Sequence, residues 1–249
     1  MTIANAYFIG TPECWLLADT GIPGNERRIR LAAEKRFGPG AKPRAILLTH
    51  GHFDHAGSAA GLADFWGVQV HVHRMEFPFL TGKSDYPPLD PTPPGFFSKL
   101  SRFFPSSTVN LGDRLSALAE MPYLQDWECV HTPGHSPGHV AFFRRADGAL
   151  IAGDAVTTMN LDSLIGTLMK KPELCRPPVP ATTNWPQAHE SVRKLAALQP
   201  SLVAAGHGPP LRGVQKQMQA LADHFPIPIR GRYVAHPVHF DENDVVPRR

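Results

Sequence analysis

Cysteine is scarce in this chain of 249 residues and follows no recognisable pattern. The three cysteines, Cys14, Cys129 and Cys175, are odd in number, widely separated, and include no C-x-x-C pair. This distribution argues against a disulfide framework and against a zinc site built from thiolates. Histidine and the carboxylates therefore remain as the candidate metal ligands.

The sequence also lacks a long apolar run, a basic leader and a strong net charge. No stretch of about 18 apolar residues occurs, so we expect no membrane span. Residues 1–19 contain no basic segment followed by an apolar run and a cleavage site, so we expect no signal peptide and assign the chain to the cytoplasm by default. The formal net charge of +3 is too small to predict binding to nucleic acid.

Short apolar runs alternate with segments of helical spacing along most of the chain. Hydrophobic residues make up 42% of the sequence, which is enough for a sizeable core. We expect strands at residues 6–10, 14–18, 45–48, 68–72, 109–111, 127–131, 140–144, 150–152 and 202–205. We expect helices at residues 25–37, 57–66, 187–198 and 211–224. This alternation predicts an α/β protein, and no repeat or linker divides residues 1–249 into more than one domain.

Two stretches break this rhythm. Residues 77–108 are rich in Pro and Phe and form an irregular insert, and residues 157–183 also contain several prolines. A long segment without periodicity inside a compact domain is usually a functional lid or a mobile loop, and a packed surface excursion is the alternative for 77–108. We expect the insert to supply an apolar wall above a binding site. The tail, residues 226–249, is polar and interrupted by Pro.

Thirteen histidines are many for this length, and four candidate ligands gather within six residues. His50, His52, Asp54 and His55 follow the apolar run 45–48 in the pattern H-x-H-x-D-H. In extended chain, residues i and i+2 point to the same side, so His50 and His52 can bind one ion together. Asp54 and His55 come where the chain turns toward a helix, and there they can reach a second ion. Imidazole and carboxylate suit Zn²⁺, and also Mn²⁺ or Fe²⁺.

Three later motifs follow in order along the chain. His135 lies in the sequence TPGH, Asp154 in AGD after the predicted strand 150–152, and His207 in GHG after the predicted strand 202–205. Together with the H-x-H-x-D-H motif, they resemble the signature of the metallo-β-lactamase superfamily over about residues 5–220. The resemblance implies the fold of that superfamily, a four-layer αβ/βα sandwich of two mixed β-sheets with helices on the outer faces.

The resemblance also implies the ligands of two divalent metal ions, which we expect to be zinc, with iron or manganese as alternatives. One ion would be held by His50, His52 and His135, the second by Asp54, His55 and His207, and both by a bridging Asp154. Asp19 matches a further element of the family, and we predict that it orients a ligand without binding metal. The alternative for Asp19 is a simple turn residue, since Asp and Gly are common in turns.

The activity implied by the resemblance is that of a metal-dependent hydrolase. Two dications about 3.5–4 Å apart lower the pKa of a shared water, and the resulting hydroxide would attack the substrate, with Asp54 aiming it. The superfamily includes β-lactamases, glyoxalase II-type thioesterases, lactonases, phosphodiesterases and persulfide dioxygenases. We predict a small ester-like substrate, namely a lactone, ester or thioester, because an apolar wall suits it better than a nucleic acid. Only 42 residues follow His207, which disfavours a glyoxalase II with its helical C-terminal extension.

The alternative functions are a mononuclear iron dioxygenase of the persulfide dioxygenase type and a phosphodiesterase. Retention of all seven candidate ligands favours two metal ions over one, and an enzyme over a non-catalytic scaffold. Apart from a small-molecule substrate, the one partner left open is a second copy of the chain. Family members often have one strand before the first strand predicted here, so an unpaired sheet edge could form a homodimer.

Overall fold

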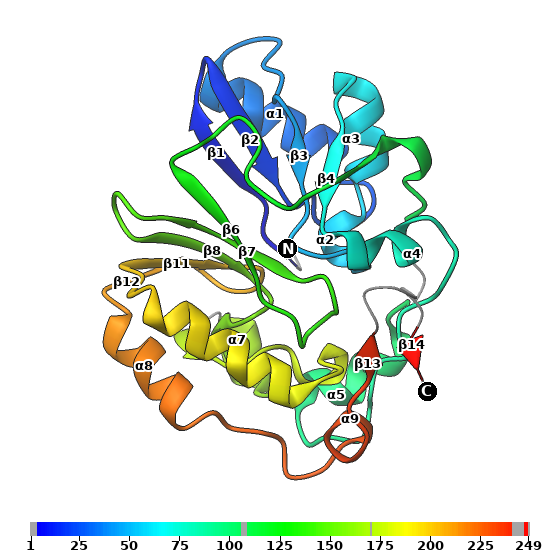
Figure 1. The fold of residues 1–249 in the computed structure, drawn as a ribbon, viewed down its shortest axis with the longest axis vertical. Helices are drawn as coiled ribbons and strands as arrows, with labels where there is room; N and C mark the ends of the chain where they lie inside the picture. The colour runs from blue at the N-terminus through cyan, green and yellow to red at the C-terminus, as the bar shows by residue number, and fades with distance from the viewer. Residues whose placement is uncertain (1–3, 106–108, 170, 241–246, 249) are drawn as a thin grey trace.

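The computed structural model describes residues 4–105, 109–169, 171–240 and 247–248, and within them two five-stranded sheets face each other (Figure 1). The first sheet has the strand order β1-β2-β3-β4-β5. Its strands are β1 (Tyr7–Thr11), β2 (Cys14–Ala18), β3 (Ile46–Leu47), β4 (Val70–Val72) and β5 (Leu115–Ala117). β1 and β2 form an antiparallel hairpin, whereas β2 to β5 run parallel to one another.

The second sheet has the strand order β12-β11-β8-β7-β6. Its strands are β6 (Trp127–His131), β7 (Val140–Arg144), β8 (Ala149–Gly153), β11 (Leu202–Ala205) and β12 (Leu211–Arg212). β8 and β11 are parallel, and the other neighbours are antiparallel. Two small sheets pair β9 (Thr157–Met159) with β10 (Pro172–Cys175), and β13 (His239–Phe240) with β14 (Pro247–Arg248). Both large sheets are therefore mixed, as predicted.

The longer helices cover the outer faces of the two large sheets (Figure 1). α1 (Glu26–Phe37) and α3 (Ala59–Trp66) lie on the first sheet, and α7 (Trp185–Ala197) and α8 (Gln215–Asp223) lie on the second. This order of layers confirms the predicted four-layer αβ/βα sandwich. The short helical segments are α2 (Phe53–Ala56), α4 (Phe77–Leu80), α5 (Phe96–Leu100), α6 (Leu164–Met169), α9 (Arg232–Ala235), η1 (Arg74–Glu76), η2 (Ser101–Phe103), η3 (Gly112–Arg114) and η4 (Val179–Ala181). Among the described residues, no helix combines the length and apolar character needed to cross a membrane.

Apolar layers fill the sandwich because its central strands are buried on both faces. Leu16 and Leu47 pack between the two sheets, in the same cluster as Phe142 of β7. Their sequence neighbours, Leu17 and Leu48, pack on the other face of the first sheet, in the cluster that includes residues of α1 and α3. A strand that is buried on both faces carries a continuous apolar run instead of an alternating pattern. This burial explains the uninterrupted apolar runs at residues 14–18 and 45–48.

The candidate ligands follow strands that end at one rim of the sandwich. β3 ends at Leu47, β8 at Gly153 and β11 at Ala205, and a candidate ligand follows shortly after each of them. β8 and β11 are parallel neighbours, so their carboxyl ends lie side by side. β3 belongs to the opposite sheet, and the Val140 N–H donates to the Thr49 carbonyl at 2.8 Å across the same rim.

The structure corrects two of the predicted elements. The predicted strand 109–111 is wrong, because the strand of this region is β5 and the Asn110 side chain instead accepts the Gly112 N–H at 3.0 Å. Asn favours such local hydrogen bonds over a strand ladder. The predicted helix 211–224 begins as strand β12, because Gly213 adopts a left-handed φ of 66° that separates β12 from α8.

The insert, residues 77–108, contains α4, α5 and η2 joined by extended chain, while its residues 106–108 lie outside the described part. The stretch 157–183 contains β9, α6 and β10, so it is more regular than its prolines suggest. α5 packs against η4, which places the insert beside this second stretch. The tail contains α9, β13 and β14, with residues 241–246 and 249 outside the described part.

Candidate metal centre

The loop after β3 carries four of the candidate ligands and is anchored where it begins. The Thr49 N–H and hydroxyl both donate to the Asp19 carboxylate, at 2.8 and 2.9 Å. His52 is in an extended conformation, with φ of −60° and ψ of 151°, at the start of α2. Asp54 and His55 lie within α2 itself. The strand-to-helix turn therefore presents ligands from two adjacent backbone conformations, as the spacing predicts.

Three histidines, His50, His52 and His135, form a first group whose ring nitrogens lie within 4.8 Å of one another. His52 Nδ1 and His135 Nε2 are 3.0 Å apart. Burial lowers the pKa of His52 to about 4, and it lowers the pKa values of His50 and His135 well below their usual range. The three imidazoles are therefore neutral at pH 7, which is the protonation state that binds metal ions.

Asp54, His55 and His207 form a second group, whose candidate ligand atoms also lie within 4.8 Å of one another. His207 Nε2 is 3.6 Å from Asp54 Oδ2. Burial lowers the pKa values of His55 and His207, but the surrounding carboxylates, Asp154 foremost, outweigh burial and raise both values. These imidazoles attract a proton because they face carboxylates, and a metal cation would take the place of that proton.

Asp154 lies between the two groups, directly after β8. Its Oδ2 is 3.1 Å from His207 Nε2 and 3.5 Å from His135 Nε2, and its Oδ1 is 3.4 Å from His55 Nε2. Burial raises the pKa of Asp154, but His207 and His55 outweigh burial and lower it well below its usual range, so this side chain is a carboxylate. Its contacts with both groups fit the bridging position that the resemblance implies.

Three buried ligand atoms make no hydrogen bond within the described part of the chain. They are Nε2 of His50, Nε2 of His55 and Oδ1 of Asp154. Buried polar atoms in native proteins are nearly always paired, so such atoms call for a bound ion or water. Imidazole and carboxylate are also the ligand types that zinc, iron and manganese accept. The residues present therefore fit a centre of divalent cations.

Asp19 lies behind the candidate ligands and not among them. The side chain is buried, and its Oδ2 is 2.9 Å from His55 Nδ1. This contact leaves Nε2 of the same ring facing Asp154. A carboxylate that contacts the far nitrogen of a ligand histidine selects which ring nitrogen carries the proton. The position fits the orienting role proposed for Asp19, which stays a prediction.

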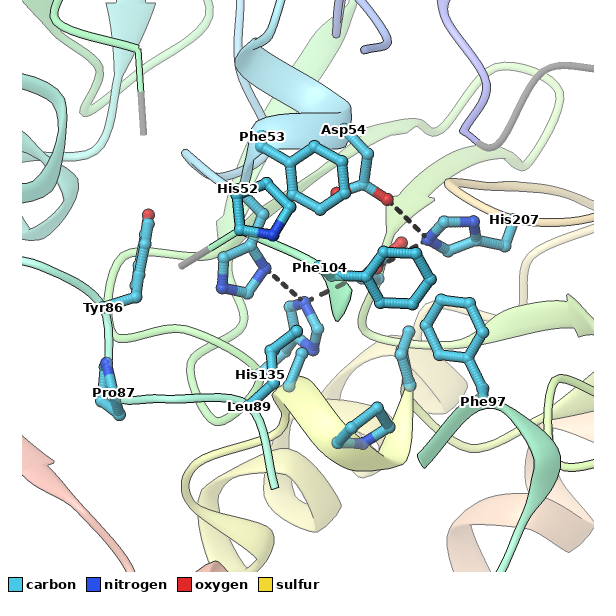
Figure 2. A pocket seen from close by; sticks show the side chains of 15 residues that line it. His52, Phe53, Asp54, Tyr86, Pro87, Leu89, Phe97, Phe104, His135 and His207 are labelled. Carbon is cyan, nitrogen blue, oxygen red and sulfur yellow. Dashed lines mark hydrogen bonds and ion pairs between the residues drawn. The ribbon is translucent and has the colours of Figure 1, made fainter. Parts of the chain in front are cut away.

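A pocket opens onto both groups of candidate ligands, and Figure 2 shows His52, Asp54, His135 and His207 among the side chains that line it. The remaining lining residues, Asp154 apart, are aromatic, aliphatic or proline, namely Phe53, Tyr86, Pro87, Leu89, Phe97, Phe104, Pro105, Pro178, Pro180 and Ala181. Most of them belong to the insert. The insert thus forms the apolar wall that the sequence predicts beside the site.

Sequence reasoning missed Glu76 and Tyr86, which contact the ligand-bearing loops without belonging to any motif. Glu76 is fully buried and accepts the Gly51 N–H at 3.0 Å, and the Tyr86 hydroxyl donates to the same carboxylate. The weak signal in the sequence is one acidic residue inside the otherwise apolar run 75–80. His139 also supports the site, because its Nε2 accepts the Asp154 N–H at 2.9 Å, while burial lowers its pKa to about 3.

Comparison with known proteins points to the same superfamily that the four sequence motifs resemble. The family model of the metallo-β-lactamase superfamily matches residues 2–207. A probable metallo-hydrolase of Bacillus subtilis, YflN, is 41% identical over 218 residues, which are 85% of this chain and 83% of the relative. A hydroxyacylglutathione hydrolase of Xanthomonas axonopodis pv. citri is 27% identical over 189 residues, which are 74% of this chain and 54% of the relative. The crystal structure of TTHA1623 in a di-iron-bound form matches with a TM-score of 0.60 at 26% identity, over 91% of this chain and 98% of that chain.

The chain therefore belongs to the metallo-β-lactamase superfamily, and its relatives include metallo-hydrolases. The resemblance drawn from the four motifs is confirmed. The family match begins at residue 2 and ends at His207, the last of the seven candidate ligands. The likeness to the TTHA1623 structure confirms the sandwich fold as well.

Proposed function

We propose that this chain is a hydrolase that holds two divalent metal ions, zinc in the first instance, and cleaves a small ester-like substrate. One observation carries the proposal. Seven side chains from loops up to 157 positions apart, as from His50 to His207, converge on two adjoining groups beside one apolar pocket. Lactones, esters and thioesters are the substrate classes that suit such a wall.

The ligand assignment follows the two groups. His50, His52 and His135 would hold one ion, Asp54, His55 and His207 the other, and Asp154 both. When bound, a pair of dications supplies a Lewis acid and lowers the pKa of water toward neutrality. Asp54 lines the pocket as well as the second group, so its carboxylate can accept a proton or a hydrogen bond from the attacking water.

The side chains of the pocket support hydrolysis by water instead of a covalent intermediate. Among the described residues that line it, there is no serine, threonine, cysteine or lysine that could act as a nucleophile. The rings of Phe97 and Phe104 have centroids 5.2 Å apart, and the Phe104 ring stacks on the ring of Phe53, so the three side chains form an apolar surface. Such a surface can hold an acyl group next to the ions and keep bulk water away from the reacting carbonyl.

Iron is the alternative metal, because the similar structure of TTHA1623 is described in a di-iron-bound form. A mononuclear iron dioxygenase is the alternative function. A single iron ion would leave one group of candidate ligands without a metal. Each of the two groups nevertheless has three candidate ligands close together, which favours two ions.

The test combines metal analysis with a substrate panel. We expect about two divalent ions per purified chain and hydrolysis within a panel of lactones, thioesters, phosphodiesters and β-lactams. His52→Ala and Asp54→Ala should lose metal and activity together, whereas His224→Ala, which changes an exposed histidine, should keep both. Full metal content in His52→Ala would contradict the ligand assignment. One iron per chain with oxygen uptake would favour the dioxygenase.

A further inference from the structure

Among the described residues that line the pocket beside the candidate metal centre, there is no lysine or arginine. Apart from the candidate metal ligands, all described residues that line it are aromatic, aliphatic or proline. The one polar atom among them, the Tyr86 hydroxyl, is already engaged, since it donates to Glu76 and accepts the Gly51 N–H at 3.1 Å. Among the described side chains of the pocket, a ligand therefore finds available hydrogen-bonding groups at the metal centre alone.

We infer that the site selects acyl compounds that carry no charge away from the reacting carbonyl, an inference that rests on the proposed function. A carboxylate elsewhere on the substrate would lose its hydrating water and lie against Phe97, Phe104 and Leu89. No lysine or arginine among the described lining residues could pair with it. Burying an unpaired charge is costly, whereas burying an uncharged amide or alkyl group costs much less. Glutathione thioesters, which carry two carboxylates on the leaving group, are then poor substrates.

The test uses two thioesters of one acyl group, such as phenylacetyl, that differ in a single group on the thiol. One thiol is 3-mercaptopropionamide and the other is 3-mercaptopropionate, so size is matched and charge is not. We expect kcat/KM for the amide to exceed that for the carboxylate by about tenfold to a hundredfold, because the charge is left unpaired. Equal kcat/KM values, or a preference for the carboxylate, would overturn the charge selection. Hydrolysis of neither thioester would instead count against the proposed function.

A matched pair of variants locates the effect in the pocket. Leu89→Lys places a cation on the wall and should raise kcat/KM for the carboxylate thioester relative to the amide by about tenfold. Leu31→Lys, on the exposed face of α1, should leave the ratio unchanged. If Leu31→Lys changed the ratio as much as Leu89→Lys, long-range attraction and not the pocket wall would account for selection.

A second inference comes from the buried carboxylate of Glu76, which lies at the end of η1 and is 0% exposed. Its Oε1 accepts the Ser136 hydroxyl at 2.8 Å and the Gly138 N–H at 2.7 Å. Its Oε2 accepts the Gly51 N–H at 3.0 Å and the Tyr86 hydroxyl. Four donors from three separate segments thus meet on one carboxylate, and no described cation takes part in this cluster.

Three of these donors, all except the Tyr86 hydroxyl, belong to the two loops that carry the first group of histidines. Gly51 stands between His50 and His52, and Ser136 directly follows His135. Hydrogen bonds to buried carboxylates are among the stronger ones in proteins, so Glu76 holds the two loops at a set separation. Tyr86 extends the cluster to the pocket wall, because its ring centroid lies 4.4 Å from that of His52.

We propose that Glu76 is a positioning residue for the metal centre, which holds His52 and His135 together before any metal binds. The two histidines that it would position lie close together, with His52 Nδ1 and His135 Nε2 3.0 Å apart. Close packing leaves little freedom, because a Cβ added to Gly138 would lie 2.7 Å from Glu76 Cγ. Preorganised ligands bind metal more tightly, since less ordering remains to be done on binding.

The variant Glu76→Gln keeps the shape of the side chain and replaces one acceptor oxygen by a donor NH2 group. Whichever way the amide turns, its nitrogen faces the N–H of Gly51 or Gly138, and two donors cannot pair. In the metal-free protein we expect amide hydrogen exchange to quicken by at least about tenfold in residues 49–55 and 132–139. Cobalt titration should show the affinity of the first site lowered by about tenfold to a hundredfold. Glu190→Gln, an exposed matched change, should alter neither.

The pattern of exchange separates positioning from general stability. Faster exchange spread equally over β8 and α7 would mean that Glu76 only stabilises the fold, and this result would overturn the proposal. Unchanged exchange and cobalt affinity would overturn it too. Tyr86→Phe, which removes one hydroxyl and keeps the ring, is the milder variant if Glu76→Gln does not fold. It should quicken exchange near Gly51 but not near Gly138, and equal effects at both would contradict the proposed division of the cluster.

Discussion

The substitution Asp19→Asn tests how the protein selects the protonation state of His55. Asp19 Oδ1 accepts the Thr49 N–H at 2.8 Å, and Oδ2 lies 2.9 Å from both the Thr49 hydroxyl and His55 Nδ1. Since the backbone N–H of Thr49 requires an acceptor, the amide oxygen of Asn must take the place of Oδ1. The amide nitrogen then faces His55. Asn also tolerates the left-handed φ of 57° at this position, so the backbone is not strained by the change.

The expected effect follows from which nitrogen of His55 carries the proton. With an amide N–H opposite Nδ1, that nitrogen must become the acceptor, and the proton moves to Nε2. Nε2 is the atom that lies 3.4 Å from Asp154 Oδ1 and is assigned to the second metal ion. A protonated nitrogen cannot bind metal, so we expect metal affinity at the second site to fall about tenfold to a hundredfold, or roughly 1.4–2.8 kcal/mol.

A second variant, Asp19→Gly, separates this effect from lost stability. Gly accepts the left-handed φ but removes the carboxylate, which leaves the Thr49 N–H and His55 Nδ1 without their buried partner. Each unpaired buried donor costs about 1–3 kcal/mol, so we expect unfolding free energy to fall by about 2–6 kcal/mol. His55 is nevertheless free to keep its proton on Nδ1.

The assays are urea unfolding of the metal-free protein and metal titration of each variant under conditions where it is folded. We expect the two variants to rank in opposite orders in the two assays. Asp19→Gly should lose more stability, and Asp19→Asn should lose more affinity at the second site. If the wild type, Asp19→Asn and Asp19→Gly ranked in the same order for metal affinity as for stability, the reasoning from the protonation of His55 would be wrong.

Two further predictions concern the metal-free protein. Burial holds the pKa of His52 at about 4 and that of His139 at about 3, so the unfolded chain binds more protons than the folded protein as pH falls below about 6.5, and stability decreases. His55 has a raised pKa, and the stability it contributes is lost as pH rises above about 6.5. The free energy of unfolding, measured in urea, should therefore have a maximum near that pH. A steady rise of this free energy from about pH 5 to 8 would contradict the prediction. Trp15→Ala should lower the unfolding free energy by about 3–5 kcal/mol in the same assay, because Trp15 is 1% exposed and stacks on Phe37 at 4.6 Å; a loss below about 1 kcal/mol would show that the core closes around the gap.

Local patterns of the sequence predicted an α/β protein and brought forward the seven candidate ligands, and the resemblance of the four motifs to the superfamily implied the sandwich fold. The apolar run 45–48 followed by H-x-H-x-D-H is a strand and a turn, and each depends on residues only a few positions apart. The same locality explains the errors. A three-residue apolar run at 109–111 has too little pattern to reveal that Asn110 closes a turn, and Gly213 alone ends β12.

Only the tertiary structure revealed what holds the ligands in place. The bonds to Glu76 join it to residues 25 positions away at Gly51 and 62 positions away at Gly138, in opposite directions along the chain. The Asp19 carboxylate meets His55 over 36 positions. No periodicity encodes such pairs, because they form only when the two sheets pack and bring their rims together. The identity of a ligand is a property of its local motif, whereas its position and protonation depend on neighbours that folding supplies.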